Sequence, residues 1–242
     1  MNGWHTVVIS DVHIGSPFCR HELFLKFLDT LRPGTTVVFN GDTIDNPQRP
    51  PSDVDRVLID RIEDLASRCT VIWLFGNHDL GHRPCTSAAI SYRDTYAIGD
   101  RLLVAHGHQF DVVKPQHRLF IKSFRIFYRV WMALTRQSMH EAQFAKHWAF
   151  LYNHLRRKVR QLALAGARAA GCEAVACGHV HYAEQTKADG ISYLNTGAWT
   201  ESPTYCVCVD AETIMLRTVE ELVDRHHTGN GGKDPRHCPS TP

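Results

Sequence analysis

Long hydrophobic runs are missing from this 242-residue sequence, so an integral membrane protein is not expected. Paired Cys-x-x-Cys motifs are also missing, and the eight cysteines are too sparse for a disulfide scaffold. No secretory signal sequence precedes the first apolar segment, residues 6–10. We therefore expect a reduced, cytoplasmic protein that forms one large domain, or one domain with an insertion.

Acidic residues are nearly absent from one part of the chain. Residues 114–160 contain 11 Lys or Arg and one acid, Glu141, so the net charge of +2 for the whole chain conceals a basic segment. The rest of the chain is acidic on balance and contains no extended basic track. We therefore expect no nucleic-acid partner, and the basic segment indicates an anionic substrate or a membrane surface.

Strand and helix patterns alternate over the first 75 residues. Apolar runs at 6–10, 36–39 and 71–74 predict buried strands, and amphipathic patterns at 21–31 and 52–68 predict helices between them. This order is typical of parallel strands with right-handed crossovers. Further strands are predicted at 95–98, 101–105, 173–177, 183–187, 191–195, 205–209 and 213–218. Residues 226–242 are rich in Gly, Pro and His and predict a disordered tail.

Polar side chains follow five of the predicted strands where each strand ends. In α/β folds the carboxyl ends of parallel strands meet at one crevice, so these side chains are expected to converge. Carboxylates, imidazoles and one amide suit Mn, Zn or Fe better than Ca or Mg, and they are too many for one tetrahedral site. Each cluster alone is ambiguous, since a strand-end Asp with an exposed His needs no metal. The candidates are Asp11, His13, Asp42, Asn77, His78, His106, His179 and His181.

Five motifs occur in order between Asp11 and His181, within a resemblance that covers residues 6 to about 218. They are Asp-x-His, Gly-Asp-x-x-Asp, Gly-Asn-His-Asp, His-Gly-His and Gly-His-x-His, and together they resemble the calcineurin-like metallophosphoesterase superfamily. The resemblance implies an α/β fold, an αββα sandwich with a helical cap insertion. It implies a metallophosphoesterase domain over residues 1–225, with the cap at 112–170 and the tail at 226–242.

The resemblance also implies a role for each motif residue. The first ion would be held by Asp11, His13, Asp42 and His181. Asp42 would bridge to the second ion, which Asn77, His106 and His179 would complete. The two divalent ions, Mn by resemblance with Fe or Zn as alternatives, would provide a bridging hydroxide that attacks phosphorus. His78 would be the catalytic histidine with Asp79 as its partner, and Asp45 would accept a hydrogen bond from a histidine. His108 is predicted either to reach the site or to lie on an exposed loop.

The basic segment combines two stripes. Arg118, Lys122, Arg125 and Arg129 share one helix face, and a second stripe is apolar. A further helix is predicted from about residue 139 to 167. An ordinary helical hairpin packed on the body explains the apolar stripe, whereas the charge and the aromatics together favour an anionic substrate with an acyl portion.

The insertion and the segment from Asn195 to Ser202 resemble the UDP-2,3-diacylglucosamine pyrophosphohydrolase group. That resemblance implies cleavage of a lipid-linked pyrophosphate to UMP and an acylated sugar phosphate in lipid A assembly, at the inner membrane surface. The expected substrate contacts are Asn77, Arg125, Arg129 and Trp199. His78 and Val180 depart from that group, whose best-known members have Arg and Thr there. The alternatives are a soluble phosphodiesterase or nucleotide pyrophosphatase, and a non-catalytic metal-binding scaffold.

Overall fold

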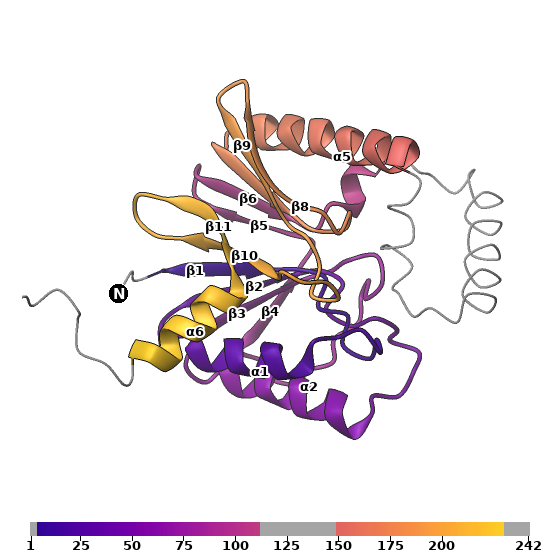
Figure 1. The fold of residues 1–242 in the computed structure, drawn as a ribbon, viewed down its shortest axis with the longest axis vertical. Coiled ribbons are helices and arrows are strands. Elements are labelled where there is room, and N and C mark those ends of the chain that lie inside the picture. The colour runs from indigo at the N-terminus through magenta and orange to yellow at the C-terminus, as the bar shows by residue number, and fades with distance from the viewer. Residues whose placement is uncertain (1–3, 112–148, 230–242) are drawn as a thin grey trace, which may run out of the picture.

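The computed structural model describes residues 4–111 and 149–229, which form two mixed β-sheets packed face to face (Figure 1). The six-stranded sheet runs from edge to edge through β11 (Ile214–Thr218), β10 (Tyr205–Val209), β1 (Thr6–Ile9), β2 (Thr36–Asn40), β3 (Thr70–Leu74) and β4 (Ile90–Arg93). The five-stranded sheet runs through β5 (Thr95–Ile98), β6 (Leu102–Ala105), β7 (Ala174–Cys177), β9 (Ile191–Thr196) and β8 (Ala183–Ala188).

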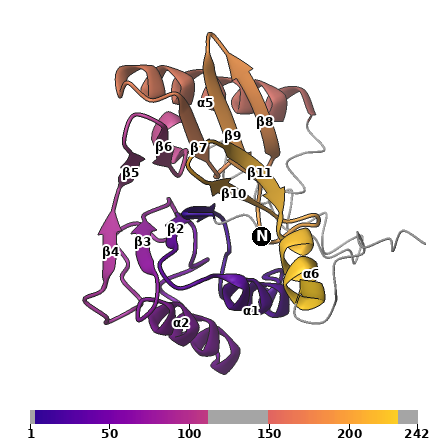
Figure 2. The same ribbon diagram turned by 90° about the vertical axis from the view of Figure 1, so that its left-hand side faces the viewer.

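Helices cover the outer face of each sheet, as Figure 2 shows. The six-stranded sheet packs on α1 (His21–Thr30), α2 (Asp53–Leu65) and α6 (Val219–Gly229), and the five-stranded sheet packs on α5 (Ala149–Ala169). Three buried apolar layers separate these four structural layers. The middle layer lies between the sheets and includes Val8, Ile72, Val104 and Leu194. The predicted αββα sandwich is therefore confirmed, with burial of apolar surface as its main stabilising contribution.

The parallel strands bring the predicted site residues together at the carboxyl ends of the strands. The strands β1 to β4 pair in parallel, and β6, β7 and β9 pair in parallel in the other sheet. The loops that leave β1, β2, β3, β6 and β7 at their carboxyl ends carry the five motifs. The alternation of strands and helices in the sequence is thus the feature that assembles the site.

Local sequence signals explain several element boundaries. Ser52 caps α2 in a capping box, since its hydroxyl accepts from Asp55 N while the Asp55 carboxylate accepts from Ser52 N. The β8–β9 hairpin turns at Asp189 and Gly190, both with positive φ, as the Asp-Gly pair predicted.

One strand and one α-helix were not predicted from the sequence. The strand β4 has one buried residue, Ile90, so its alternation is too weak to recognise. The helix α6 extends to Gly229, so the predicted boundary of a disordered tail at residue 226 is wrong. Its apolar residues Val219 and Val223 are buried in the core that α1 and the six-stranded sheet share, and this packing stabilises a helix whose local pattern is short.

The predicted insertion divides into two parts. Its second part is α5, whose buried residues Val159, Ala163 and Ala167 lie on the side of the five-stranded sheet. The helix therefore supplies the fourth layer of the sandwich, although the predicted cap at 112–170 included it. Residues 112–148, which contain Arg125 and Arg129, lie outside the described residues. No helix in the described ranges is long and apolar enough to cross a membrane.

Candidate metal centre

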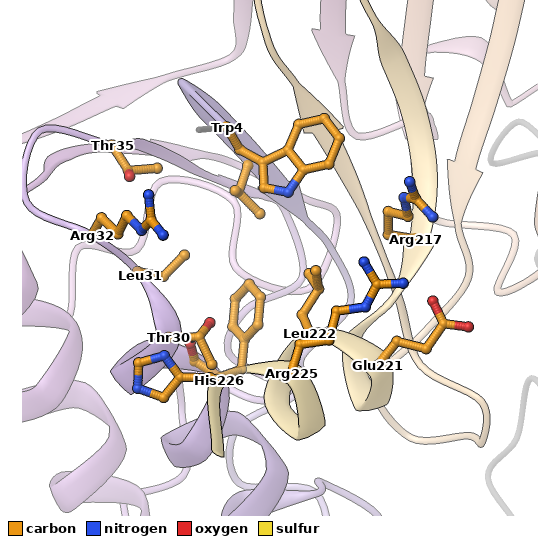
Figure 3. Close-up of a pocket in the computed structure, with 12 residues that line it drawn as sticks. Trp4, Thr30, Leu31, Arg32, Thr35, Arg217, Glu221, Leu222, Arg225 and His226 are labelled. Carbon is orange, nitrogen blue, oxygen red and sulfur yellow. The ribbon is translucent and has the colours of Figure 1, made fainter. Parts of the chain in front are cut away.

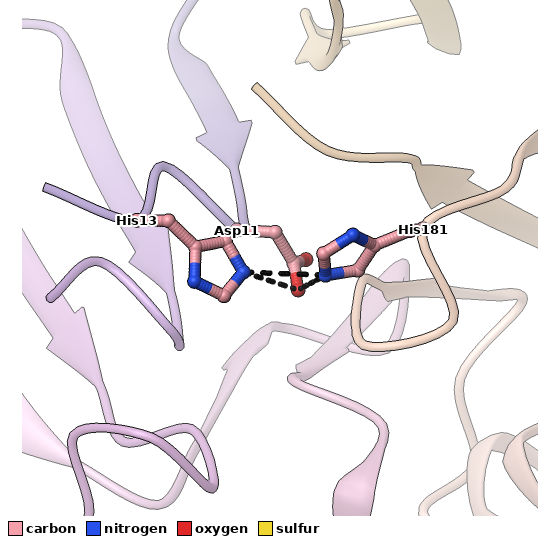
Figure 4. A group of neighbouring side chains, drawn as sticks. All are labelled: Asp11, His13 and His181. Atoms are coloured by element: carbon pink, nitrogen blue, oxygen red, sulfur yellow. Dashed lines mark hydrogen bonds and ion pairs between the residues drawn. The ribbon is translucent and has the colours of Figure 1, made fainter. Parts of the chain in front are cut away.

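The first cluster of site residues joins the loop after β1 to the loop after β7. Asp11, His13 and His181 are buried, and their potential ligand atoms lie within 4.8 Å of one another (Figure 4). His181 Nε2 lies 3.1 Å from Asp11 Oδ1 and 3.2 Å from His13 Nε2. A carboxylate and two imidazole nitrogens that point at one spot form a donor set suited to a transition metal.

The second cluster joins the loops after β2, β6 and β7. Asp42, His106 and His179 again bring their potential ligand atoms within 4.8 Å of one another. His106 Nε2 lies 3.2 Å from Asp42 Oδ2, is buried, and makes no hydrogen bond within the described residues. A buried imidazole nitrogen that makes no hydrogen bond is costly, and here it lies beside a carboxylate oxygen, so the pair fits two ligands of one cation.

The two clusters share loops and hydrogen bonds. Asp11 belongs to the first cluster, and its carboxylate accepts from the backbone N–H of His179 in the second, at 3.0 Å. Asp42 belongs to the second, and its Oδ1 accepts from the backbone N–H of His78 at 2.7 Å. The first bond joins the two clusters, as the predicted pair of ions requires, and the second ties Asp42 to the loop after β3 that carries His78.

Five of these residues have a strained backbone. Asp11, His13, Asp42, His179 and His181 have φ between 50° and 66°, in the left-handed region that non-glycine residues seldom adopt. Among the described residues, Asp189 is the one other non-glycine with positive φ. Such conformations persist where the surrounding structure enforces them, and they are concentrated at functional sites. The backbone strain therefore marks the same residues as the sequence motifs.

The motif glycines allow the loops to approach one another. A Cβ at Gly76 would collide with the Asp42 carboxylate, and a Cβ at Gly178 would collide with the side chains of Ser10 and Asp11. Any side chain at either position would therefore displace a cluster carboxylate.

Outer hydrogen bonds fix the orientation of the imidazoles. His13 Nδ1 lies 2.9 Å from Asp45 Oδ1, which agrees with the role expected of Asp45. His106 Nδ1 donates to the Asn40 carbonyl at 2.8 Å, because a carbonyl can only accept, and this leaves Nε2 as the potential ligand atom. His179 Nε2 lies 3.0 Å from Asp111 Oδ2. Asp111 was not predicted as a site residue, although it ends the motif that begins at His106.

The electrostatics of the clusters favour positive charge. Burial alone would raise the pKa of Asp11, but His106 and His181 lower it to about 2. Burial alone would lower the pKa of His106, but Asp42 and Asp11 raise it to about 9. Buried carboxylates thus remain charged and hold cations beside them. Divalent ions would satisfy the same demand, so the residues present fit a metal centre.

The structure corrects the predicted partner of His78. Asp79 is fully buried, and its carboxylate accepts hydrogen bonds from the backbone N–H groups of Gly76, Asp42, Thr43 and Ile44. It therefore orders the loops after β2 and β3. His78 is exposed, and its Nδ1 donates to the Asp45 carbonyl at 2.8 Å. Asn77 is also exposed, on the same loop.

The structure also corrects the predicted role of Trp199 as a substrate contact. Its side chain is fully buried and packs edge-on against the rings of Phe24 and Phe27, with 5.3 Å between centroids in both pairs. The tryptophan is a core residue, and its backbone N–H donates to the Asp11 carbonyl at 3.0 Å. It thus supports the first cluster through the main chain.

His108 lies close to the second cluster. Its ring centroid is 5.5 Å from that of His106 and 6.4 Å from that of His179. Burial, followed by the charges of His106 and His179, lowers the pKa of His108 to about 4. Of the two positions predicted for this residue, the structure shows the one beside the site.

The helix α5 contacts the loop that carries His179 and His181. Tyr152 Oη donates to the Val180 carbonyl at 2.7 Å, and the Arg156 guanidinium lies 3.8 Å from the centroid of the Tyr182 ring. Arg156 and Arg160 lie 3.7 and 3.4 Å from Glu184 Oε2. A cationic helix is therefore attached directly beside two candidate ligands.

One family model and several solved structures are similar to this chain. A family model described as calcineurin-like phosphoesterase matches residues 5–183. The chain is similar to the solved structure of YfcE, a phosphoesterase from E. coli, at 12% identity and a TM-score of 0.44, over 90% of this chain and 94% of that one. It is similar to an archaeal phosphodiesterase at 15% identity and a TM-score of 0.44, over 88% and 96% of the two chains. It is also similar to Vps29 from Chaetomium thermophilum at 12% identity and a TM-score of 0.43, over 88% and 95%.

The comparison with curated protein sequences finds no match. The solved structures are distant, so the assignment rests on the family model, which spans most of the chain and all five motifs. The chain belongs to the calcineurin-like phosphoesterase family and is a metal-dependent phosphoester hydrolase.

Proposed function

We propose that this enzyme hydrolyses the pyrophosphate of UDP-2,3-diacylglucosamine or of a related nucleotide-linked lipid precursor. The observation that carries the proposal is the contact between α5 and the loop of His179 and His181, through Tyr152 and Val180. This contact places a cationic helix beside the candidate metal centre, where it would attract an anionic substrate.

The charges of α5 support a substrate with more than one negative group. Arg156, Arg157, Lys158 and Arg160 lie within two turns of the helix, and Glu184 neutralises part of their charge. Guanidinium groups bind phosphate oxygens in pairs of parallel hydrogen bonds, so a pyrophosphate suits them better than a neutral ester. Arg125 and Arg129 are proposed to contact the substrate as well, and they lie outside the described residues.

The residues of the site have distinct roles in this proposal. Asp11, His13, Asp42, Asn77, His106, His179 and His181 would hold two divalent ions, with Mn²⁺ proposed as the metal. When bound, such ions polarise a phosphoryl oxygen and lower the pKa of water. His78 donates from Nδ1 to the Asp45 carbonyl, so in the imidazolium form its Nε2–H is the group that would donate to a phosphoryl oxygen or give its proton to the leaving group. The exposure of His78 keeps it accessible to substrate.

The proposal includes peripheral contact with the inner membrane surface. A lipid-linked substrate resides in the bilayer, and a basic segment is attracted to anionic lipid. Residues 114–160 carry the charge that this contact needs, with 11 Lys or Arg and one acid.

The experiment that tests the substrate is hydrolysis of UDP-2,3-diacylglucosamine with added Mn²⁺. We expect UMP release by the unaltered enzyme and its loss in His179→Ala. In Arg125→Ala/Arg129→Ala we expect a higher KM for the lipid substrate and an unchanged KM for a small chromogenic diester. Equal losses on both substrates would contradict a substrate-specific role for these arginines.

The same experiment separates the alternatives. Metal-dependent cleavage of the chromogenic diester without UMP release would favour a soluble phosphodiesterase or nucleotide pyrophosphatase. Inactivity on both substrates would favour a metal-binding scaffold.

A further inference from the structure

A pocket lies at the amino-terminal end of β1 and β2, whereas the metal centre lies at the carboxyl end of these strands. It has a volume of about 360 Å³ and lies among the segment before β1, the segment from α1 to β2, β11 and α6 (Figure 3). Trp4 and Thr35 precede the first residues of β1 and β2, whereas Asp11 and Asp42 follow their last residues. The four residues of β1 alone separate the two ends of this strand by ~13 Å. The pocket is therefore distinct from the metal centre.

The lining of this pocket is cationic. Arg32, Arg217, Arg225 and His226 are among the residues that line the hollow (Figure 3), and Glu221 is the one acidic side chain among its described lining residues. These residues come from the loop after α1, from β11 and from α6, so the fold brings the charges together. Guanidinium groups from different elements around one hollow form a recognisable site for phosphate.

An apolar and aromatic surface completes the pocket. The indole of Trp4 forms one wall, and the Arg217 guanidinium lies 6.0 Å from its centroid. Val7, Phe27 and Leu31 are buried beneath, and they continue into the core of the six-stranded sheet. A flat apolar group would lose contact with water against this wall and floor.

We propose that this pocket binds a nucleoside monophosphate. The phosphate would lie among the arginines, and the base would stack on the Trp4 indole. Such stacking does not depend on which base the nucleotide carries. The volume falls within the range of small-molecule sites. The proposal does not depend on the proposed function, because the pocket and the metal centre lie at opposite ends of the strands β1 and β2.

The test is calorimetric titration of the full-length enzyme, after removal of metal by a chelator, with AMP as the probe. Chelation removes the metals of the other site, so a bound nucleotide reports on this pocket. We expect saturable binding of one AMP per chain, with weaker binding of ribose 5-phosphate, which lacks the base, and of adenosine, which lacks the phosphate. Arg217→Gln and Arg225→Gln should each weaken AMP binding by about tenfold.

Further variants distinguish the pocket from a general charge effect. Trp4→Leu should weaken AMP binding but leave ribose 5-phosphate binding unchanged, since it removes the aromatic wall alone. Arg168→Gln is the matched control, because Arg168 is exposed on α5 and pairs with Asp189. Circular dichroism spectra would establish that each variant is folded. Arg217→Lys, compared with Arg217→Gln, tests whether a positive charge without the planar guanidinium restores part of the affinity for AMP.

Three results would overturn the proposal. One is the absence of saturable AMP binding to the metal-free enzyme. Another is equal affinity for AMP and ribose 5-phosphate, which would show that the base is not recognised. The third is AMP binding that Arg217→Gln and Trp4→Leu leave unchanged, which would place the nucleotide elsewhere.

Discussion

The hydroxyl of Tyr152 on α5 donates a hydrogen bond to the carbonyl of Val180, the residue between His179 and His181. Both histidines have a left-handed backbone, which the surrounding structure has to enforce. The helix thus positions the loop that contributes one candidate ligand to each cluster, so the fourth layer of the sandwich has a part in the site as well as in the core.

Removal of this hydrogen bond should weaken the metal centre more than the fold. In Tyr152→Phe, we expect metal affinity or metal-supported activity to fall by about 10- to 100-fold, as is typical when an outer partner of a ligand is removed. The melting temperature should change by a few degrees at most. Tyr96→Phe on the edge strand β5 is the matched control and should have neither effect. A large loss of stability with unchanged metal affinity would contradict the positioning role.

Asp79 should act through the loops rather than through His78. In Asp79→Asn one carboxylate oxygen becomes an amide group that cannot accept, so at least two of four backbone donors lose their partner. We expect a loss of about 1–3 kcal/mol of unfolding free energy for each unsatisfied group, together with reduced activity. Denaturant unfolding checks this, with Asp64→Asn on the exposed face of α2 as the control. Unchanged stability with a shifted pH profile of activity would instead support a direct partnership with His78.

Trp199 should behave as a core residue. Trp199→Ala is expected to cost about 3–5 kcal/mol of unfolding free energy, as large-to-small changes at buried aromatic positions do. The milder Trp199→Phe should lower the melting temperature and leave KM for substrate within about twofold, because the indole is fully buried. A raised KM with unchanged melting temperature would restore the predicted substrate contact.

The capping box of α2 gives a pH-dependent contribution to stability. Burial alone would raise the pKa of Asp55, but hydrogen bonds from Ser52 and the charge of His21 hold it below its ordinary value. The contribution should be complete above the unfolded pKa of about 3.9 and be lost as pH falls through the folded pKa. Asp55→Ala should cost about 1 kcal/mol at pH 7, and urea unfolding near pH 3 should show a smaller difference. Asp53→Ala, outside the box, is the control; an equal cost at both pH values would contradict this origin.

The fold and most of the cluster residues were predictable from the sequence for a simple reason. Residues that follow a strand, such as Asp11 and Asp42, are recognisable from the preceding apolar run. Parallel strands then place these residues together. A side chain's direction depends on tertiary packing, and this is why Trp199 and Asp79 were misassigned. The helix α6 was missed because its stability comes from packing on α1 and the sheet, to which its local sequence contributes little.

The central claim is that two metal ions at the paired clusters support phosphoester hydrolysis. The most direct measurement combines metal analysis with hydrolysis of a chromogenic phosphodiester, before and after chelation and with Mn²⁺ restored. We predict two divalent ions per chain, activity lost on chelation and recovered with Mn²⁺, and loss of both metal and activity in His106→Ala. His5→Ala, at an exposed position before β1, should match the unaltered enzyme. Full turnover in the presence of chelator, or His106→Ala with unchanged metal content and activity, would contradict the account.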